Sequence, residues 1–490
     1  MVVTTLVDDT VDEASTGKLA ARVARLIERD IVRTGWRVGH VVGSETELRE
    51  RYQVSRAVLR EAIRLVEHHQ VGIMRRGPNG GLVVRAPDAG ATASAMVMYL
   101  KSVGTTLEDL TSVRIMLEPL AVTLAAEQIT ESGIAQLRSV LANERDSAIG
   151  GDADLRNRLH LTLAQLSGNP ALHLFIDVLL RLTWRYAGQQ LTHLPGPTHP
   201  GLVAAHHAHQ EIVDAVVAGH AARAQYHVQL HLDAVRDYLR NWRPPDHSAG
   251  QGTKEVLGAP LREQKLAEVV AERLLTEIIE RGWQVGSVIG SEATLLERFD
   301  VSRPALREAV RLLEYHSVAQ MRRGPGGGLV VTKPNPTASI NATALHLDYQ
   351  GLDADDLHTV REALELGCTD HLVTDVDRAL LAHRLPALAQ SPSAGNGDPG
   401  EPCHPWHIEL ADLSGNPTLA LFLRILITLR TRHQDPYPAG TGVAAVHQGI
   451  VDALLSGDAG LARHRMRRHL HRAPGGQPGP SGTGQQSEPA

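Results

Sequence analysis

The sequence predicts a mostly α-helical protein in which two winged helix-turn-helix domains, each with a small β-hairpin wing, alternate with two all-α antiparallel helix bundles. Three observations predict this fold. Residues 43–84 have the pattern helix, turn, helix, hairpin; the same stretch recurs at residues 290–331; and the segment after each copy shows helical periodicity without a convincing strand. Aromatic residues make up only 3% of the chain, which also favours helix bundles over β-sandwiches.

The first copy of the motif reads GSETELRERYQVSRAVLREAIRLVEHHQVGIMRRGPNGGLVV. We expect Glu45–Arg51 to form the first helix and Gln53-Val54 to form the tight turn. Ser55 is expected to cap the second helix, which runs to His69, because its hydroxyl can accept from backbone N–H groups of the first turn. The apolar side chains of this helix recur at helical spacing and are expected to be buried; they are Val58, Leu59, Ala62, Ile63 and Val66.

A hairpin is expected directly after the second helix. Residues 71–76 and 82–84 have the composition of short strands, and Gly77-Pro78-Asn79-Gly80 between them is a sequence that turns at little cost. Between Ser44 and Arg85 there are eight Arg against five Glu, concentrated on the second helix and the wing. A helix-turn-helix with a basic, glycine-tipped wing fits the grooves of DNA.

The chain is a duplication of a complete two-part unit. The second copy, GSEATLLERFDVSRPALREAVRLLEYHSVAQMRRGPGGGLVV, matches the first without a gap at roughly two-thirds of positions. The offset is constant, because Ser302 minus Ser55 is 247 and, in the segment beyond the motif, His407 minus His160 is also 247. Both the motif and the helical segment that follows it are therefore present twice.

The length of 490 residues and the repeat together predict four domains. We expect winged domains at 17–86 and 261–333, and helical bundles at 93–243 and 338–472. Residues 244–260, rich in Pro, Gly and charge, are expected to be a linker, and residues 473–490 a disordered tail. A flexible loop is expected at residues 390–405.

Composition predicts a soluble protein of a reducing cytoplasm that does not associate with a membrane. There are only two cysteines, so no disulfide framework is expected. Four acidic residues among the first 13 are incompatible with the basic start of a signal peptide. The most apolar run, residues 419–429, is interrupted by Arg424 and is too short to span a bilayer.

These motifs resemble those of GntR-type transcriptional regulators of the FadR subfamily, in which a winged helix-turn-helix precedes an all-helical effector-binding (FCD) domain. The resemblance rests on VSRAVLREAIRLVE and RRGPNGGLVV in the winged segment, and on VRIMLEPLA, LHLTLAQLSGNP and HQEIVDAVVAG in the helical segment. It covers nearly the whole chain, twice. It implies a regulator, more often a repressor, that binds a double-stranded DNA operator and leaves it when a small organic acid effector binds. Two fused copies imply a single-chain pseudo-dimer, which either acts as a monomer or pairs again into a homodimer.

The resemblance and the chemistry of arginine assign the same residues to DNA. A guanidinium on the recognition helix can bond bidentately to guanine in the major groove, while the wing tip and the capping serine contact the minor groove or phosphates. The residues assigned to DNA are Ser55, Arg56, Arg60, Arg76 and Gly77 in the first copy, and Ser302, Arg303, Arg307, Arg323 and Gly324 in the second. Where the family often has an arginine in the preceding helix, this chain has Thr46 and Ala293, which predicts a different operator. The alternative is that these arginines only solvate a helix face.

The resemblance also implies a metal site in each bundle, for Zn, Ni or a similar divalent ion. Three imidazoles of the family's metal-binding branch match His160, His209 and His231 in the first copy and His407, His447 and His469 in the second. The spacing between the last two is 22 residues in both copies. Three neutral imidazoles on facing helices can share one ion and leave a position open for a substrate carboxylate.

The fourth ligand of the family, an aspartate one turn before the first histidine, is replaced by Arg156 and by Cys403. Arg156 would oppose a cation, so the first bundle is alternatively metal-free, with Arg156 or Arg114 meeting an anionic effector. Cys403 would complete a sound zinc set if it reaches the imidazoles. The remaining alternative is a pocket lined by buried histidines, in which Arg114 and Arg361 either face a carboxylate or form surface i, i+4 salt bridges with Glu118 and Glu365, of little energetic value.

Three functions are compatible with these residues. A ligand-responsive DNA-binding regulator accounts for the motif, the wing and the duplication together. An architectural DNA-binding protein, whose bundles only hold the winged domains, is the alternative. A three-histidine metallohydrolase is the third, but no carboxylate is placed to serve as general base in both copies, so we expect no enzyme.

Overall fold

The computed structural model describes residues 13–77, 80–147, 154–192, 200–241, 266–322, 324, 326–390, 404–433 and 443–471. The predicted tail at 473–490 and linker at 244–260 lie outside these residues, as does most of the loop predicted at 390–405. The chain forms two compact units, one of residues 1–102 with 264–351 and the other of residues 103–263 with 352–490. Each unit therefore combines the corresponding parts of both repeats.

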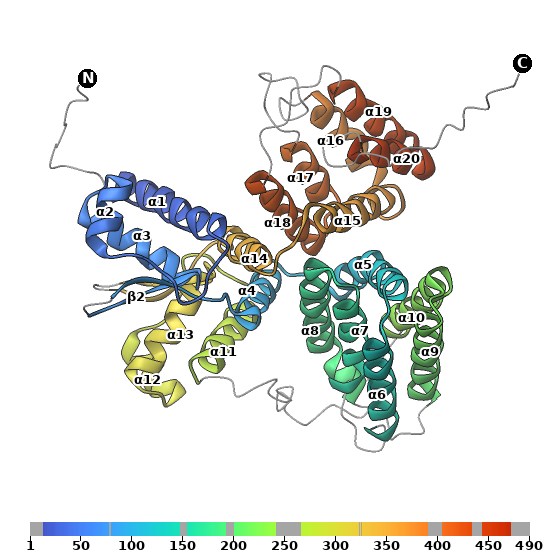
Figure 1. Cartoon of the computed structure of the whole chain (residues 1–490), viewed down its shortest axis with the longest axis horizontal. Coiled ribbons are helices and arrows are strands. Elements are labelled where there is room, and N and C mark those ends of the chain that lie inside the picture. The colour runs from blue at the N-terminus through green and yellow to red at the C-terminus, as the bar shows by residue number, and fades with distance from the viewer. Residues whose placement is uncertain are drawn as a thin grey trace, which may run out of the picture. The chain divides into compact units, whose positions relative to one another are not determined.

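The first winged domain has the predicted helices and wing (Figure 1). Its elements are α1 (Glu13–Arg33), β1 (Val41–Gly43), α2 (Glu45–Tyr52), α3 (Arg56–His68), β2 (Gly72–Arg75) and β3 (Gly81–Val84). The predicted apolar stripe of α3 is buried throughout, with exposed fractions of 0–5%. Ser55 caps α3 as expected, because its hydroxyl accepts from the Val58 N–H at 3.3 Å. The turn between the helices passes through Gln53 in the left-handed region, at φ 51°.

A third strand, β1, was not predicted from the sequence. It pairs antiparallel with β3, and the sheet order is β1-β3-β2. The pairing requires a glycine at position 81, because a Cβ there would lie 2.6 Å from the carbonyl oxygen of Gly43. Gly81 therefore not only follows the wing turn but also allows the third strand to approach closely enough to pair.

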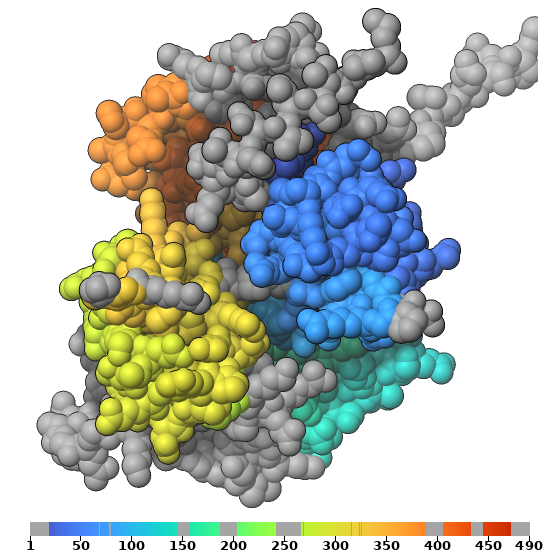
Figure 2. All heavy atoms as spheres, turned by 90° about the vertical axis from the view of Figure 1, so that its left-hand side faces the viewer, coloured from blue at the N-terminus to red at the C-terminus, as the bar shows by residue number. Residues whose placement is uncertain are grey.

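The second winged domain repeats the first. Its elements are α11 (Leu266–Glu280), β4 (Val288–Gly290), α12 (Glu292–Phe299), α13 (Arg303–Tyr315), β5 (Ala319–Arg322) and β6 (Gly328–Val331). The strand order is β4-β6-β5. Ser302 caps α13, and Pro304 follows in its first turn, where a missing N–H costs nothing. Figure 2 shows the surface of these domains, the first in blue and the second in yellow.

Each winged domain is packed against a helix of the other repeat. α14 (Thr337–Tyr349) belongs to the second repeat, yet Leu345 is buried in the core of the first winged domain, and the Tyr349 and Trp36 rings lie 5.5 Å apart. α4 (Ala89–Ser102) of the first repeat places Met98 against the core of the second winged domain. The two helices pack on each other (Figure 1), with the Ser339 hydroxyl donating to the Ala95 carbonyl at 3.1 Å.

This arrangement changes the expected domain limits. We predicted that the helical bundles begin at residues 93 and 338. In the structure the residues from there to Ser102 and Gly351 belong to the compact unit of the winged domains. Their apolar side chains gave no sign of this, because a helix that packs on a distant part of the chain has the same periodicity as one in a local bundle.

The second unit contains two all-helical bundles, as predicted. The first comprises α5 (Leu107–Glu127), α6 (Glu131–Ser147), α7 (Asp154–Leu166), α8 (Pro170–Thr192), α9 (Pro200–Val217) and α10 (Ala221–Asn241). The second comprises α15 (Ala354–Thr374), α16 (Arg378–Gln390), α17 (His404–Leu413), α18 (Pro417–His433), α19 (Val443–Ser456) and α20 (Ala459–His471). Within the described residues no helix is long and apolar enough to cross a membrane.

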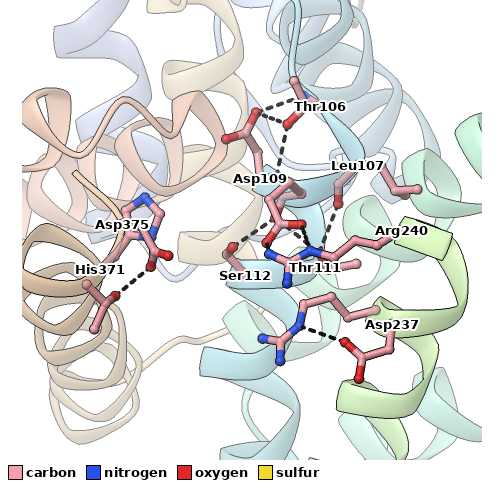
Figure 3. Close-up of polar contacts among 12 residues, drawn as sticks. Thr106, Leu107, Asp109, Thr111, Ser112, Asp237, Arg240, His371 and Asp375 are labelled. Atoms are coloured by element: carbon pink, nitrogen blue, oxygen red, sulfur yellow. Dashed lines mark hydrogen bonds and ion pairs between the residues drawn. The ribbon is translucent and has the colours of Figure 1, made fainter. Parts of the chain in front are cut away.

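Local caps fix the ends of these helices. Thr106 and Asp109 form a reciprocal capping box at the start of α5, and Arg240 of α10 donates to the Glu108 carboxylate in the first turn (Figure 3). A carboxylate in the first turn also suits the positive end of the helix dipole. The Arg240–Glu108 contact holds α10 against α5.

The two bundles pair through equivalent residues. The Phe175 and Phe422 rings stack with centroids 4.0 Å apart. The Asn169 amide donates to the Asp356 carbonyl at 3.1 Å, and the Asn416 amide donates to the Asp109 carbonyl at 3.0 Å. Phe175 and Phe422 are 247 residues apart in the chain. The two amide contacts are equivalents of each other, because 416 − 169 and 356 − 109 are also 247, as a two-fold arrangement of two repeats requires.

Candidate DNA interface and histidine centres

The arginines of the first recognition helix point outward, as the DNA-binding prediction requires. The side chains of Arg56 and Arg60 are 63% and 56% exposed. Both donate to the same carboxylate oxygen of Glu45, at 2.9 and 3.0 Å. Hydrogen bonding by Arg56, aided by Arg60, holds the pKa of Glu45 below its ordinary value. Glu45 thus holds two guanidinium groups together at the start of α2.

The second recognition helix has the same outward arginines with a looser partner. Arg307 lies 3.4 Å from the carboxylate of Glu292, and its side chain is 67% exposed. Arg303 is exposed at the first position of α13. Because Glu292 is the equivalent of Glu45 (292 − 45 = 247), the same acidic residue faces the recognition arginines in both copies.

The wing tips lie between the strands of each hairpin. Arg76 and Gly77 are exposed at the end of β2, and Gly77 has φ 119°. Gly324 is likewise exposed with φ 103°, while Arg323 lies outside the described residues. Ser55 and Ser302 are exposed at the starts of α3 and α13, so each can cap its helix and also face a phosphate.

The three predicted imidazoles of the first bundle come together in its interior. His160, His209 and His231 are all buried, and one ring nitrogen of each lies within 4.8 Å of the others; we call this the first histidine centre. The Nε2 atoms of His209 and His231 are 3.3 Å apart. The opposite nitrogens face carboxylates, with His160 Nδ1 2.6 Å from Glu118 and His209 Nδ1 2.9 Å from Glu144.

The second histidine centre repeats this geometry in the other bundle. His407, His447 and His469 are buried and converge within 4.8 Å. His469 Nε2 lies 3.1 Å from His407 Nε2 and 3.2 Å from His447 Nε2. His407 Nδ1 faces the Glu365 carboxylate, as His160 faces Glu118 in the first bundle. The Trp406 ring stacks on His447 with centroids 3.9 Å apart, a contact for which the first bundle has Leu159 instead (406 − 247 = 159).

Burial favours the neutral form of the imidazoles in the first centre, which is the form that can bind a cation. It lowers the pKa of His209 and lowers that of His231 well below its ordinary value, so both imidazoles are neutral at pH 7. Burial alone would raise the pKa of Glu118, but Arg114 and His160 outweigh it and lower the pKa to about 2. The pKa of Glu365 is lowered in the same way, against its burial, by His407 and Arg361.

The donor set of both centres fits a divalent metal. A carboxylate that accepts from Nδ1–H leaves Nε2 as an unprotonated acceptor, which applies to His160 and His209 in the first centre and to His407 in the second. Tetrahedral zinc with bonds of about 2.0–2.1 Å places two nitrogen ligands roughly 3.3–3.4 Å apart. The observed Nε2 separations of 3.1–3.3 Å are close to that spacing. One ion would satisfy lone pairs that a single imidazole proton cannot.

The residues predicted to flank the centres are placed less completely. Cys403 lies outside the described residues, and for Arg156 only its place on α7 is described. Arg114 and Arg361 form the i, i+4 salt bridges foreseen as one alternative, with Glu118 and Glu365. We expected such pairs at the surface; instead all four side chains are at most 5% exposed. Breaking a buried pair leaves an uncompensated charge and is strongly destabilising.

Sequence reasoning missed the carboxylates that orient the imidazoles. Glu118 and Glu365 were considered only as partners of arginine, and Glu144 was not considered. Their signal was present but ambiguous, because a glutamate at helical spacing is also typical of a solvated face. Trp406, which at 0% exposure is the largest fully buried side chain of the described residues, was also not singled out from the sequence.

The fold and its outward arginines define a helix-turn-helix regulator that binds DNA, and the comparisons with known proteins identify its family. The model of the bacterial regulatory proteins of the gntR family matches residues 19–84 and 266–329, and the model of the FCD domain matches residues 109–234 and 356–472. The chain belongs to the GntR family, with the winged and FCD domains of the FadR subfamily each present twice. Members of this family are transcriptional regulators and not enzymes.

Individual relatives each correspond to about one repeat. An uncharacterised HTH-type transcriptional regulator, YcbG of Bacillus subtilis, is 30% identical over 237 residues, which are 48% of this chain and 95% of that protein. The HTH-type transcriptional repressor NanR of Klebsiella aerogenes is 28% identical over 46% of this chain and 92% of its own length. A solved structure of a Streptococcus agalactiae GntR is 23% identical, with a TM-score of 0.33, and the match covers 44% of this chain and 99% of that structure.

Proposed function

We propose that this regulator is a single-chain pseudo-dimer that represses transcription in the cytoplasm by binding one pseudo-palindromic operator with both recognition helices. A small carboxylate effector bound in the helical bundles would release it. The observation that carries the proposal is the exchange of α4 and α14, through which each winged domain packs against a helix of the other repeat.

The exchange bears on how the two recognition helices act. Leu345 is 1% exposed in the core of the first winged domain, and the Ser339 hydroxyl bond to Ala95 joins α14 to α4. Lys101 of α4 also lies 3.9 Å from Glu272 of α11 in the second winged domain. Two winged domains that share packing in this way form one folding unit, so a chain with one repeat would expose apolar surface. This supports two half-sites read by one polypeptide.

Selection of bound DNA from a random pool tests this function. The proposal predicts that the enriched sequences contain two inverted half-sites at a fixed spacing, about one helical turn or a multiple of it from centre to centre. Binding should weaken steeply as salt rises, because arginine contacts to phosphate release counterions. Enrichment of single half-sites without a fixed partner would contradict the pseudo-dimer, and no enrichment would contradict operator binding.

We further propose that each histidine centre holds a divalent metal ion, with zinc or nickel favoured by three imidazole ligands, and that a coordination position left open takes the effector carboxylate. The Nε2 spacing and the carboxylates on Nδ1 support this proposal. Glu118 and Glu365 would then fix the ring orientation and raise the basicity of the ligands. A carboxylate effector bound directly by Arg114 or Arg361 is less favoured, because both guanidinium groups already pair with buried glutamates.

Thermal shift against a panel of organic acids tests the effector role. After removal of metal with a chelator, the acids should produce a small shift, and after addition of zinc a larger one. His447→Ala should abolish the zinc-dependent part in the second bundle, whereas His464→Ala, a change on α20 outside the centre, should leave it intact. Equal shifts with and without metal would favour direct binding by protein groups, and no shift with any acid would favour an architectural role.

A further inference from the structure

A third group of metal-ligating side chains lies outside the two histidine centres, in the second bundle. It consists of His358 and Glu362 on α15 and His471 at the end of α20. His358 and Glu362 are four residues apart, so they lie one above the other on the same helix face. One ligand atom of each residue lies within 4.8 Å of the other two. The side chains are partly accessible, with exposed fractions of 21%, 20% and 50% respectively.

The three ligand atoms converge without bonding to one another. His358 Nε2 lies 3.7 Å and His471 Nε2 lies 3.4 Å from the same oxygen of Glu362, and neither contact has the geometry of a hydrogen bond. The His358 Nε2 atom is covered from solvent and, among the described residues, has no hydrogen-bond partner. A buried ring nitrogen without a partner is costly, so something else is expected to satisfy it.

The remaining contacts of the group orient the carboxylate toward the gap. Arg467 of α20 donates from Nε to the other oxygen of Glu362 at 3.0 Å. Arg467 and His471 are again four residues apart, so each helix contributes an i, i+4 pair. Burial is the main cause that lowers the pKa of His358, with smaller contributions from nearby cations including Arg361 and Arg430. Those two cations would weaken the binding of a further cation at this place.

The first repeat does not have this group. The constant offset of 247 places Thr111 and Ile115 at the positions of His358 and Glu362 (358 − 247 and 362 − 247). In the last helices the offset is 238 (447 − 209 and 469 − 231), which places Asp233 at the position of His471. None of the three ligands is therefore present at the equivalent position of the first repeat.

We propose that His358, Glu362 and His471 bind a zinc ion at the surface of the second bundle, separately from the two histidine centres. Two imidazoles and one carboxylate, with water in the remaining position, are a common zinc ligand set. Bonds of about 2.0–2.2 Å bring donor atoms to separations near those observed. The ion would join the end of α20 to α15, and so stabilise the last helix of the chain.

Zinc stoichiometry of the full chain tests the site. The protein is stripped with a chelator and titrated with zinc against a chromophoric competitor, as the unsubstituted chain, as His471→Ala and as His358→Ala. Because the two histidine centres are also proposed to bind zinc, the quantity compared is the difference in zinc binding between variants. We expect each substitution to lower the affinity for one zinc ion by at least about tenfold, since even the loss of a residue that only hydrogen-bonds to a metal ligand usually lowers metal affinity that much.

Asp233→Ala, at the repeat-one position equivalent to His471, is the matched control and should leave zinc binding unchanged. The result is independent of the histidine centres, because His209→Ala and His447→Ala remove their ions and leave the surface ion in place. Equal zinc binding by the unsubstituted chain and by both ligand variants would overturn the proposal. The three side chains would then form only a surface network of charged and polar groups. Unchanged far-ultraviolet circular dichroism confirms that a loss of zinc is not a loss of fold.

Discussion

The two repeats differ much more in their bundles than in their winged domains. Outward arginines, a capping serine and an acidic partner occur at equivalent places on both recognition helices. The histidine centres keep three imidazoles and one glutamate each, but the first adds Glu144 and the second adds the stacked Trp406. If the chain reads two similar half-sites, as proposed, it needs two similar recognition helices, whereas the two histidine centres are free to take different ligands.

The largest effect is expected from substitutions that test whether the two recognition helices contribute equally to DNA binding. Arg60→Ala and Arg307→Ala should each weaken operator binding by about 5- to 150-fold, since one bidentate arginine–guanine contact contributes roughly 1–3 kcal/mol. The double variant should lose roughly 25-fold or more, because distant sites add. Fluorescence anisotropy with a labelled operator measures this.

Arg223→Ala is the control for that series. This arginine is 58% exposed and paired with Glu211 on the surface of the first bundle, so it shares the exposure but not the place on a recognition helix. Its loss should change affinity by less than about twofold. If only one of Arg60 and Arg307 mattered, the two helices would not act as equivalent readers, and the comparison between the repeats would fail.

The exchanged helices sharpen the comparison, because they are not equally buried. Leu345 is 1% exposed within the first winged domain, whereas Met98 only borders the second. Leu345→Ala should lower the free energy of unfolding of the winged unit by about 2–5 kcal/mol, the usual range for a core leucine. Met98→Ala should cost clearly less. Denaturant unfolding measures both, with the exposed Leu461→Ala as control; equal losses for Leu345 and Leu461 would show that α14 does not pack in that core.

A pH series tests the buried imidazoles of the first centre. The folded pKa of His231 lies well below its ordinary value near 6.5, so the unfolded chain binds the proton more readily. Its contribution to stability is present above about pH 6.5 and is lost as the pH falls below it, by about 1.4 kcal/mol per pH unit. The metal-free chain should therefore melt at lower temperature at pH 5 than at pH 7.

His231→Gln should reduce that pH dependence, and the exposed change His220→Gln should not. Zinc should restore stability at pH 7 and do so less at pH 5, because protons compete with the ion for the imidazoles. A melting temperature of the metal-free chain that is independent of pH over this range would mean that the imidazoles are charged, or solvated, in the folded state.

The smallest expected effect concerns the acidic residue beside the recognition arginines. Glu45 holds Arg56 and Arg60, while Glu292 lies 3.4 Å from Arg307. Glu45→Gln should raise DNA affinity a few-fold, because it frees two guanidinium groups and removes a negative charge near phosphate. Glu292→Gln should raise it less. Weaker binding by Glu45→Gln would instead show that the carboxylate orders the arginines for DNA.

The sequence predicted best what local chemistry determines. The Ser55 cap, the buried stripe and the limits of α2 and α3 all depend on residues close in the chain; the structure confirmed the cap and the stripe, and the helix limits to within one residue. The sequence did not predict β1, because a strand of three residues is too short to show a periodic pattern. It also did not predict the exchange of α4 and α14, nor the partner of His209. Those contacts join segments that are far apart in the chain, and one sequence holds no signal that pairs them.

The mass of the protein–operator complex tests the central claim most directly. Light scattering on a chromatographed complex counts the chains on one pseudo-palindromic duplex, with a duplex that carries one intact half-site as reference. We predict one whole chain on the full operator, with both recognition helices of that chain required for protection of both half-sites; one chain on each half-site would contradict the claim. In a mixture of the Arg60→Ala and Arg307→Ala variants, no chain has both arginines intact. If such a mixture still protected both half-sites, the claim that a single polypeptide reads both would be contradicted.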